Sequence, residues 1–264
     1  MVVCVGEEAV ARRSRVTPKT ARELLLMRRA GEIVAQALAA MREAVKPGIT
    51  TAELDVLAEE VIRREGAIPS FKGYLGYPAS ICASVNEEIV HGIPCGRRLQ
   101  EGDIVSLDVG AIWEGYQGDA AITLPVGEVS PIARRLMEAT ERALEAGIAA
   151  ARAGQRLGDV SHAIESVARA AGFEIIREYG GHGIGREMWE DPRIPNWGPP
   201  GRGMLLKAGM TLALEPMLAA KGYQTRVLDD HWTVVTQDKS LSAHFEHTIA
   251  ITENGAEILT RLPD

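Results

Sequence analysis

The sequence predicts an α/β protein in which two similar halves share one sheet. Each half shows two amphipathic helical patterns followed by short strand patterns. The glycines that end the helices recur 106 residues apart, since Gly48 and Gly66 correspond to Gly154 and Gly172. A period of this length is too long for a solenoid repeat and too short for two large independent domains. We therefore expect one internally duplicated domain.

The boundaries of this domain follow from where the patterns begin and end. Residues 1–16 have no clear period and are interpreted as a short N-terminal tail. Residues 17–264 form the expected single domain, whose halves cover about 17–130 and 131–260. A pseudo-twofold axis would relate the two halves.

In the first half, Thr17-Pro18 is expected to cap a helix that ends near Gly48, because the apolar residues between them recur at helical spacing. A second helix is expected from Thr50 or Thr51 to Gly66. A loop rich in glycine and aromatic residues follows and leads into a strand at 81–85.

The next predicted elements are strands and then helices. A strand at 104–109 is followed by a hairpin that turns at Glu114-Gly115, and another strand opens at Asp119. The second half then repeats the helices, over about 131–151 and up to Gly172. A shift of 107 residues places the strand 102–108 on 209–215, so that the two carboxylates ending these strands fall in register.

The composition is that of an ordinary globular protein of 264 residues, with 46% hydrophobic and 25% charged residues. Lysine and arginine number 29 against 36 acidic residues, and no long basic block marks a nucleic-acid or anionic-membrane partner. The three cysteines form no CxxC pair, which favours a reducing compartment. No apolar run reaches the roughly 18 residues of a membrane span. We expect a cytoplasmic protein with a small or peptidic partner, and a monomer.

Four acidic residues carry the chemistry of the predicted sheet: Asp108, Asp119, Glu215 and Glu246. Each alone is compatible with a solvated strand end or turn. Asp108 and Glu215 nevertheless follow apolar strands, and a buried carboxylate is costly unless it is paired or metal-bound. Since no lysine or arginine on these strands is placed to neutralise them, two divalent ions would balance the charge. Oxygen donors with one nitrogen suit Mn, Fe, Co or Zn in a two-metal hydrolytic site.

His182 is the nitrogen that such a site needs. It lies among four glycines in Tyr179-Gly180-Gly181-His182-Gly183-Ile184-Gly185, where the missing Cβ atoms permit close approach to a ligand. A tight loop with an incidental histidine is the alternative for this segment taken alone.

Together these motifs resemble those of the type I methionine aminopeptidases. The resemblance covers about Thr17 to Thr260 and rests on several separate motifs. They are Asn86-Glu87, Val90-His91-Gly92-Ile93-Pro94, Gly102-Asp103-Ile104-Val105 with Asp108, Gly118-Asp119, Gly181 to Gly185, Leu214-Glu215-Pro216 and Ser240 to Thr248. The resemblance implies the pita-bread fold, in which two pseudo-twofold-related α/β halves share a central curved, mostly antiparallel sheet with helices on its outer face.

The resemblance also implies roles for individual residues. Asp108, Asp119, His182, Glu215 and Glu246 would bind two metal ions, as the charge argument proposes independently. Glu215 would move the proton of the attacking water, and His91 would protonate or orient the scissile amide, although a single histidine such as His91, taken alone, is more often a loop histidine with satisfied hydrogen bonds. The positions matching the wall of the methionine pocket are Tyr74, Tyr77, Cys82 and Trp232, with core or rim packing as the alternative.

One position departs from the family pattern. The family places a histidine, followed by an acidic residue and proline, where this chain has Trp189 before Glu190-Asp191-Pro192. That histidine contacts the substrate's peptide group, whereas an indole can donate one hydrogen bond but cannot accept one. Met188, beside it, stands where an aromatic residue is common and can still line an apolar pocket.

The expected function is metal-dependent, co-translational removal of the initiator methionine from nascent proteins and peptides whose second residue is small, with the ribosome as a candidate partner. A proline-directed peptidase of the same fold is a weaker alternative, because such relatives usually carry a large additional N-terminal domain. A non-catalytic pita-bread module that binds peptides is another, and Trp189 is its main support. Filled metal-ligand positions favour the enzyme.

Overall fold

The computed structural model describes residues 16–262, and the predicted tail therefore lies almost entirely outside the described residues. The helices are α1 (Ala21–Ala44), α2 (Thr51–Arg64), α3 (Pro131–Ala150) and α4 (Leu157–Ala171), with a short 3-10 turn, η1, at Tyr74–Gly76. The strands of the first half are β1 (Ile68–Pro69), β2 (Ile81–Val85), β3 (Glu88–Val90), β4 (Ile104–Trp113) and β5 (Tyr116–Pro125). Those that follow α4 are β6 (Glu174–Ile175), β7 (Gly180–Gly183), β8 (Glu190–Pro195), β9 (Thr211–Leu214), β10 (Met217–Ala219), β11 (Thr225–Val227), β12 (Val234–Thr236), β13 (Ser242–His244), β14 (Glu246–Thr252) and β15 (Gly255–Ile258).

A nine-stranded antiparallel sheet forms the centre of the molecule, with its main path in the order β1-β4-β5-β14-β9-β7-β8. Strands β2 and β15 pair with β4 and β14 off this path, and two three-stranded sheets, β13-β10-β6 and β11-β12-β3, complete the structure. Strands from both halves of the sequence meet where β5 pairs with β14. The sheet is therefore shared, as the sequence predicts.

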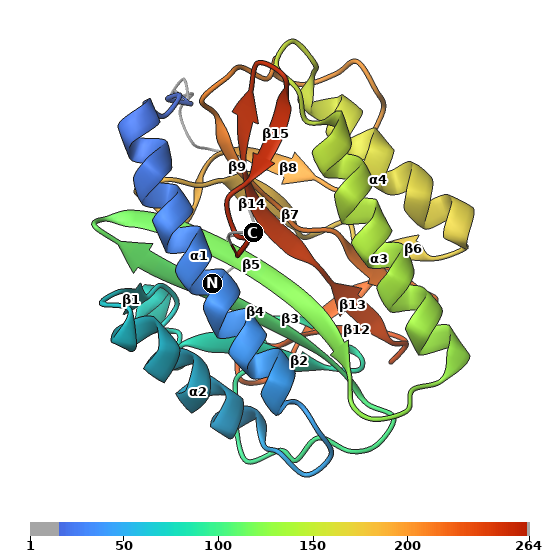
Figure 1. Cartoon of the computed structure of the whole chain (residues 1–264). Helices are drawn as coiled ribbons and strands as arrows, with labels where there is room; N and C mark the ends of the chain where they lie inside the picture. The colour runs from blue at the N-terminus through green and yellow to red at the C-terminus, as the bar shows by residue number, and fades with distance from the viewer. Residues whose placement is uncertain (1–15, 263–264) are drawn as a thin grey trace.

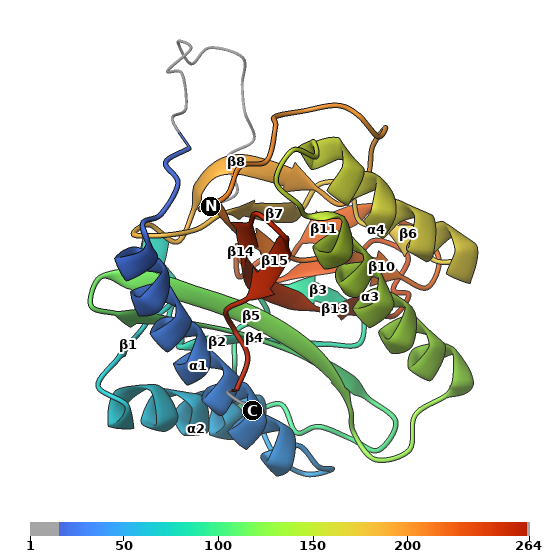
Figure 2. The same ribbon diagram turned by 45° about the horizontal axis from the view of Figure 1, so that its top comes forward.

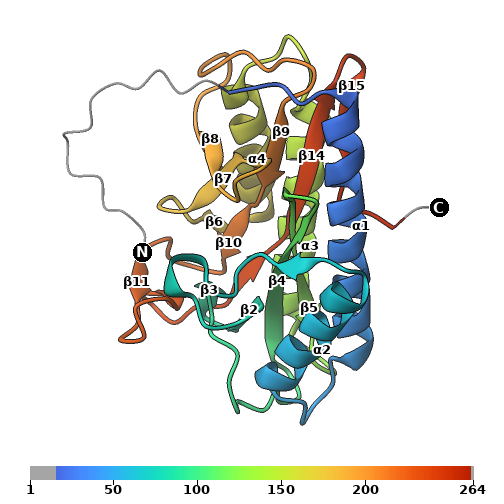
Figure 3. The ribbon, with the colours of Figure 1, turned by 90° about the vertical axis from the view of Figure 1, so that its left-hand side faces the viewer.

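The helices pack in two pairs against this sheet (Figure 1). Helix α1 lies beside α2, and α3 lies beside α4 (Figure 2). Figure 3 shows α1 and α2 on one side of β4 and β5, with β3 and β11 on the other. The core between these layers contains apolar side chains from α1, α3 and the inner faces of β4, β5 and β14. The opposite face of β4, β5 and β14 carries polar side chains, among them Asp108, Asp119 and Glu246.

Helix α1 begins later than the sequence predicts. Its N-cap is Thr20, whose hydroxyl accepts from the backbone N–H of Glu23, while the Glu23 carboxylate accepts from the Thr20 N–H at 2.8 Å. This reciprocal capping box satisfies two backbone donors, and Thr17-Pro18 offers no equivalent pair. The predicted start at Thr17 was wrong by one turn.

The predicted strand at Asp119 is not a separate element. Strands β4 and β5 each run for ten residues and pair along their whole length, from Ile104 opposite Pro125 to Trp113 opposite Tyr116. The turn at Glu114-Gly115 was predicted correctly, and both of its residues have positive φ angles. Asp119 therefore lies inside a continuous strand.

Helix α1 crosses β5 at a pair of glycines. A Cβ atom on Gly31 would lie 2.2 Å from the carbonyl oxygen of Leu259, and one on Gly118 would lie 2.8 Å from the backbone nitrogen of Gly31. Only glycine permits this approach. Because Gly118 precedes Asp119, the crossing fixes the helix directly behind a proposed site residue.

We expect Gly31→Ala to destabilise the protein by about 1–3 kcal/mol, because the backbone near Leu259 must move to admit a methyl group. Helix propensity alone would predict a gain of about 1 kcal/mol. Urea unfolding measures the difference, and Gly96→Ala, whose Cβ would meet nothing within 4 Å, is the control. A stabilised Gly31→Ala protein would show that the crossing is not tightly packed.

Candidate functional site

The register of the central sheet brings the predicted carboxylates to one face. Directly opposed residues of an antiparallel pair share a face, as do residues two apart on one strand. Asp108 lies opposite Ala121, and Asp119 lies two residues before Ala121 on the same strand. Glu246 of β14 also lies opposite Ala121. All three carboxylates therefore project from the same side of β4, β5 and β14.

The same register adds His182 and Glu215. His182 of β7 lies opposite Ala213 of β9, which in turn lies opposite Thr248, two residues beyond Glu246 on β14. Glu215 follows β9 two residues after Ala213. Donor atoms of Asp119, His182 and Glu246 lie within 4.8 Å of one another, and His182 Nε2 is 3.6 Å from Glu215 Oε1. The structure thus brings the predicted residues together.

The hydrogen bonding of His182 prepares it to bind a cation. Its Nδ1 lies 2.9 Å from the carbonyl oxygen of Gly183, which can only accept, so Nδ1 carries the hydrogen. Burial lowers the pKa of His182 to about 4, and the ring is neutral at pH 7. Nε2 therefore presents a lone pair toward Glu215, the arrangement typical of a histidine metal ligand.

Asp119 and Glu246 are buried and Asp108 and Glu215 are partly buried, and among the described residues no lysine or arginine forms an ion pair with any of the four. Within residues 16–262, the ion pairs of Glu215 and Glu246 are with histidines only. Burial raises the pKa of Asp108 to about 7, and burial together with neighbouring carboxylates raises the pKa values of Asp119, Glu215 and Glu246 well above their usual range. The buried oxygens Asp108 Oδ1, Asp119 Oδ1 and Glu246 Oε1 have no hydrogen-bond partner. Divalent cations would fit these unpaired oxygens and offset the charge.

Buried side chains hold the backbone beneath the donors. The Thr248 hydroxyl accepts from the Asp119 N–H at 3.1 Å and donates to the Asp119 carbonyl at 2.8 Å, which ties β14 to β5. Asn196 donates from Nδ2 to the carbonyl oxygen of Glu215 at 3.0 Å. These contacts fix Asp119 and Glu215 from strands other than their own.

A cavity of about 460 Å³ opens above the donors. Asp108, Asp119, His182, Glu215 and Glu246 contribute to its wall. Every other residue that the sequence singled out for the substrate also lines it: Tyr74, Tyr77, Cys82, His91, Met188, Trp189 and Trp232. The wall is largely apolar around a charged group of donors, which is typical of a small-ligand site.

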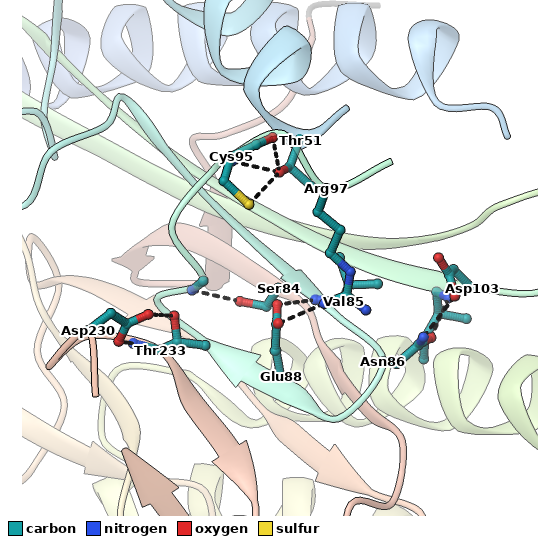
Figure 4. A network of polar contacts seen from close by, with 12 residues as sticks. Thr51, Ser84, Val85, Asn86, Glu88, Cys95, Arg97, Asp103, Asp230 and Thr233 are labelled. Atoms are coloured by element: carbon teal, nitrogen blue, oxygen red, sulfur yellow. Dashed lines mark hydrogen bonds and ion pairs between the residues drawn. The ribbon is translucent and has the colours of Figure 1, made fainter. Parts of the chain in front are cut away.

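His91 enters this cavity from a constrained loop after β3. Its backbone has a φ of 61°, in the left-handed region, and the next residue, Gly92, donates its N–H to Ser84 Oγ at 3.1 Å. Glu88 accepts from the Val85 N–H at 2.8 Å, as Figure 4 shows. A non-glycine residue in this region is uncommon and costs energy, so the surrounding contacts must hold it there. Burial lowers the pKa of His91 to about 4, so its ring is neutral.

One apolar wall of the cavity is built by Tyr77, Cys82 and Trp232. The Tyr77 hydroxyl lies 3.0 Å from the carbonyl oxygens of Ile81 and Gly92, which turns its polar atom away from the cavity. Its ring meets Trp232 edge to face at 5.0 Å. Burial raises the pKa of the Cys82 thiol, which agrees with a packing role and not with a nucleophile.

Trp189 forms the opposite side, where it stacks on His182. The two rings are 5.0 Å apart and inclined by 16°, while 57% of Trp189 is exposed. Met188, in contrast, is buried. Trp189 therefore contacts the donor residue His182 with its ring and is exposed to solvent at the rim of the cavity.

Comparison with known proteins identifies the family. The model of metallopeptidase family M24 matches residues 25–253. Methionine aminopeptidase 1 of Mycobacterium tuberculosis is 55% identical over 254 residues, covering 93% of this chain and 96% of that protein. Methionine aminopeptidase 1 of Bacillus subtilis is 53% identical over 244 residues, covering 92% and 98%. The chain belongs to the type I methionine aminopeptidases.

A solved structure of a methionine aminopeptidase agrees. The protein from Thermotoga maritima has a TM-score of 0.93 at 49% identity, and the match covers 94% of this chain and all of that one (100%). The predicted pita-bread fold is therefore confirmed. The high identity to methionine aminopeptidases also favours this enzyme over the non-catalytic binding module and the proline-directed peptidase.

The sequence analysis missed His244, and it also missed Phe71, Glu178, Tyr179 and Arg193, which line the cavity. His244 ends β13, and its Nε2 lies 3.7 Å from Glu246 Oε2 and 3.9 Å from Glu215 Oε2. Its position two residues before Glu246 was a signal, since such residues share a face of a strand.

Within residues 16–262, no helix has the length and apolar character needed to cross a membrane.

The metal-free protein should lose stability as the pH rises from 7 to 9. Folded carboxyls with raised pKa values keep protons that the unfolded chain has already released, so the free energy of unfolding falls with pH. Each carboxyl still protonated contributes up to about 1.4 kcal/mol per pH unit. The buried histidines, whose pKa values are lowered, act in the opposite sense but below about pH 6.5.

Urea unfolding in the presence of a chelator, at pH 7, 8 and 9, measures this slope. Asp119→Asn is the matched control, because it removes one titrating group without changing the size of the side chain. We expect a shallower slope in that variant. Equal slopes in the two proteins would contradict the assignment to the carboxylates.

Proposed function

We propose that this protein removes the N-terminal methionine from peptides and nascent chains whose second residue is small. The observation that carries the proposal is the group of buried oxygen and nitrogen donors at the base of a mainly apolar cavity. Membership of the methionine aminopeptidases agrees with it. The apolar wall fits a methionine side chain, and the donors fit the hydrolysis of the peptide bond beside it.

The metal ligands in this proposal are Asp108, Asp119, His182, Glu215 and Glu246. Their four carboxylates and one neutral imidazole would hold two divalent ions such as Mn, Fe, Co or Zn. When bound, the ions supply the Lewis acidity that activates water and polarises the substrate carbonyl. The unpaired buried oxygens of Asp108, Asp119 and Glu246 support this assignment.

Glu215 and His91 are the proposed proton-handling residues. Glu215 lies 3.6 Å from His182 at the centre of the donor group, where its carboxylate can take a proton from water and return it to the leaving amine. His91 lies in the same cavity with a neutral ring, which can donate a hydrogen bond to the scissile amide. The tight loop around Gly92 supports a fixed orientation for it.

Specificity for methionine would come from the wall made by Tyr74, Tyr77, Cys82 and Trp232, with Met188 buried beside it. The second residue of the substrate would face Trp189, whose indole covers His182 at the rim. A bulky second side chain would compete with this indole for space. The preference for a small second residue follows.

The wider setting is also part of the proposal. Residues 17–264 would act as one catalytic domain, monomeric and cytoplasmic, on chains that emerge from the ribosome. The absence of a basic block in a chain of net charge −7 supports a peptide partner over a nucleic acid.

The direct test is release of methionine from Met-Ala-Ser after the metal-free protein is loaded with Mn²⁺ or Co²⁺. We expect turnover only with metal, and Glu215→Gln should lower kcat by about 10²–10⁴-fold through loss of the proton acceptor. Glu253→Gln, on an exposed turn, is the control and should match the unaltered protein. Folded, metal-loaded protein that releases no methionine would refute the proposal.

Trp189→His should raise kcat for the same peptide by about tenfold, the equivalent of about 1.4 kcal/mol from one further hydrogen bond to the peptide group. The reason is that an imidazole can both donate and accept. Trp189→Phe keeps a flat ring beside His182 without a polar atom, so it serves as the matched control. If the histidine and phenylalanine variants have equal kcat values, position 189 does not hydrogen-bond the substrate.

A further inference from the structure

His244 lies against two of the proposed metal ligands without a role in the mechanism above. The residue is 1% exposed, and its Nε2 is buried with no hydrogen-bond partner. The nearest acceptors are Glu246 Oε2 at 3.7 Å and Glu215 Oε2 at 3.9 Å. A buried polar atom without a partner is uncommon and requires an explanation.

The backbone of His244 is fixed on both edges. On one side it pairs with Met217 of β10, two residues after Glu215. On the other, its N–H donates to Thr123 Oγ1 at 2.9 Å, and the same hydroxyl donates to its carbonyl oxygen at 2.7 Å. Ser106 Oγ lies a further 2.9 Å from Thr123 Oγ1. The imidazole is therefore presented to the carboxylates by a rigid support.

Glu215 lies between two imidazoles that meet different oxygens. His182 faces Oε1 and His244 faces Oε2. His182 shares with Asp119 and Glu246 a cluster whose donor atoms all lie within 4.8 Å, and His244 is outside that cluster. The geometry thus places His182 among the clustered donors and His244 beside the carboxylates but outside that cluster.

We propose that His244 is a positioning residue that donates its Nε2–H to Glu215 and Glu246 and so holds both carboxylates in the orientation that binds metal. This inference rests on the metal ligands proposed above. The present separations exceed hydrogen-bond length by less than 1 Å, and a small rotation of either carboxylate as it turns to a cation would close them. Histidine is suited to this task because its neutral ring has one donor on a stiff side chain.

The test compares His244→Leu, which removes the donor, with His244→Gln, which keeps an N–H at similar reach. Calorimetric titration of each metal-free protein with Co²⁺ measures affinity and stoichiometry, and the visible absorption spectrum of the bound Co²⁺ reports ligand geometry. We expect His244→Leu to bind about 10–100-fold more weakly at unchanged stoichiometry, with an altered spectrum. His244→Gln should restore most of the affinity.

His247→Gln is the matched control. His247 is close in sequence, but its Nδ1 lies 2.9 Å from the Thr260 hydroxyl and not from a carboxylate. It should bind Co²⁺ like the unaltered protein, which separates a general effect of losing a histidine from the effect of losing this donor.

Three results would overturn the inference. Unchanged Co²⁺ affinity and spectrum in His244→Leu would show that Nε2 positions nothing. Loss of one bound ion in both the leucine and glutamine variants would make His244 a ligand itself. If the unaltered protein, shown to be folded, binds no ion, the proposed metal ligands fail and the inference fails with them, whereas the first two results leave the metal ligands intact.

Discussion

The crowding of four carboxylates, two buried and two partly buried, on one face of the sheet is the constraint on which the rest of the site depends. Each anion alone would cost several kcal/mol to remove from water, and their mutual repulsion adds to that cost. The partners that the protein supplies are neutral histidines and not cationic side chains. In the metal-free state, burial raises the pKa values of all four groups, and neighbouring carboxylates raise those of Asp119, Glu215 and Glu246 further. Divalent cations bound at the proposed site would offset the negative charge of these carboxylates.

The carboxylates stay close together only if the strands that carry them cannot move apart. The ladder between β4 and β5 continues over ten residue pairs, and the two glycines at the crossing with α1 bring a helix into direct backbone contact behind it. Thr248 adds two hydrogen bonds across the pairing of β5 and β14. Because these contacts involve backbone atoms and short side chains, the carboxylates have few ways to move apart.

Much of this arrangement could be predicted from the sequence because it follows from periodicity. The repeat that brings Asp108 into register with Glu215 is a linear pattern, and the burial of their strands is visible in the apolar residues around them. The start of α1 was missed because two threonine caps compete, and the deciding contact is the reach of Glu23 to Thr20. His244 was missed for a different reason. Its position two residues before Glu246 was a weak local signal, and its approach to Glu215 depends on the pairing of β13 with β10, which the sequence pattern does not show.

Trp189 and His244 are two aromatic residues beside the four carboxylates and His182, and they lie in different environments. Trp189 stacks on His182 at the open rim, where 57% of the indole meets solvent. His244 lies at the closed side, where water cannot satisfy its ring nitrogen. A hydrogen bond is worth more in the second environment than in the first, because no solvent competes for the carboxylate. The proposed selection of substrate at the rim and the proposed orientation of the carboxylates therefore depend on different residues, Trp189 and His244.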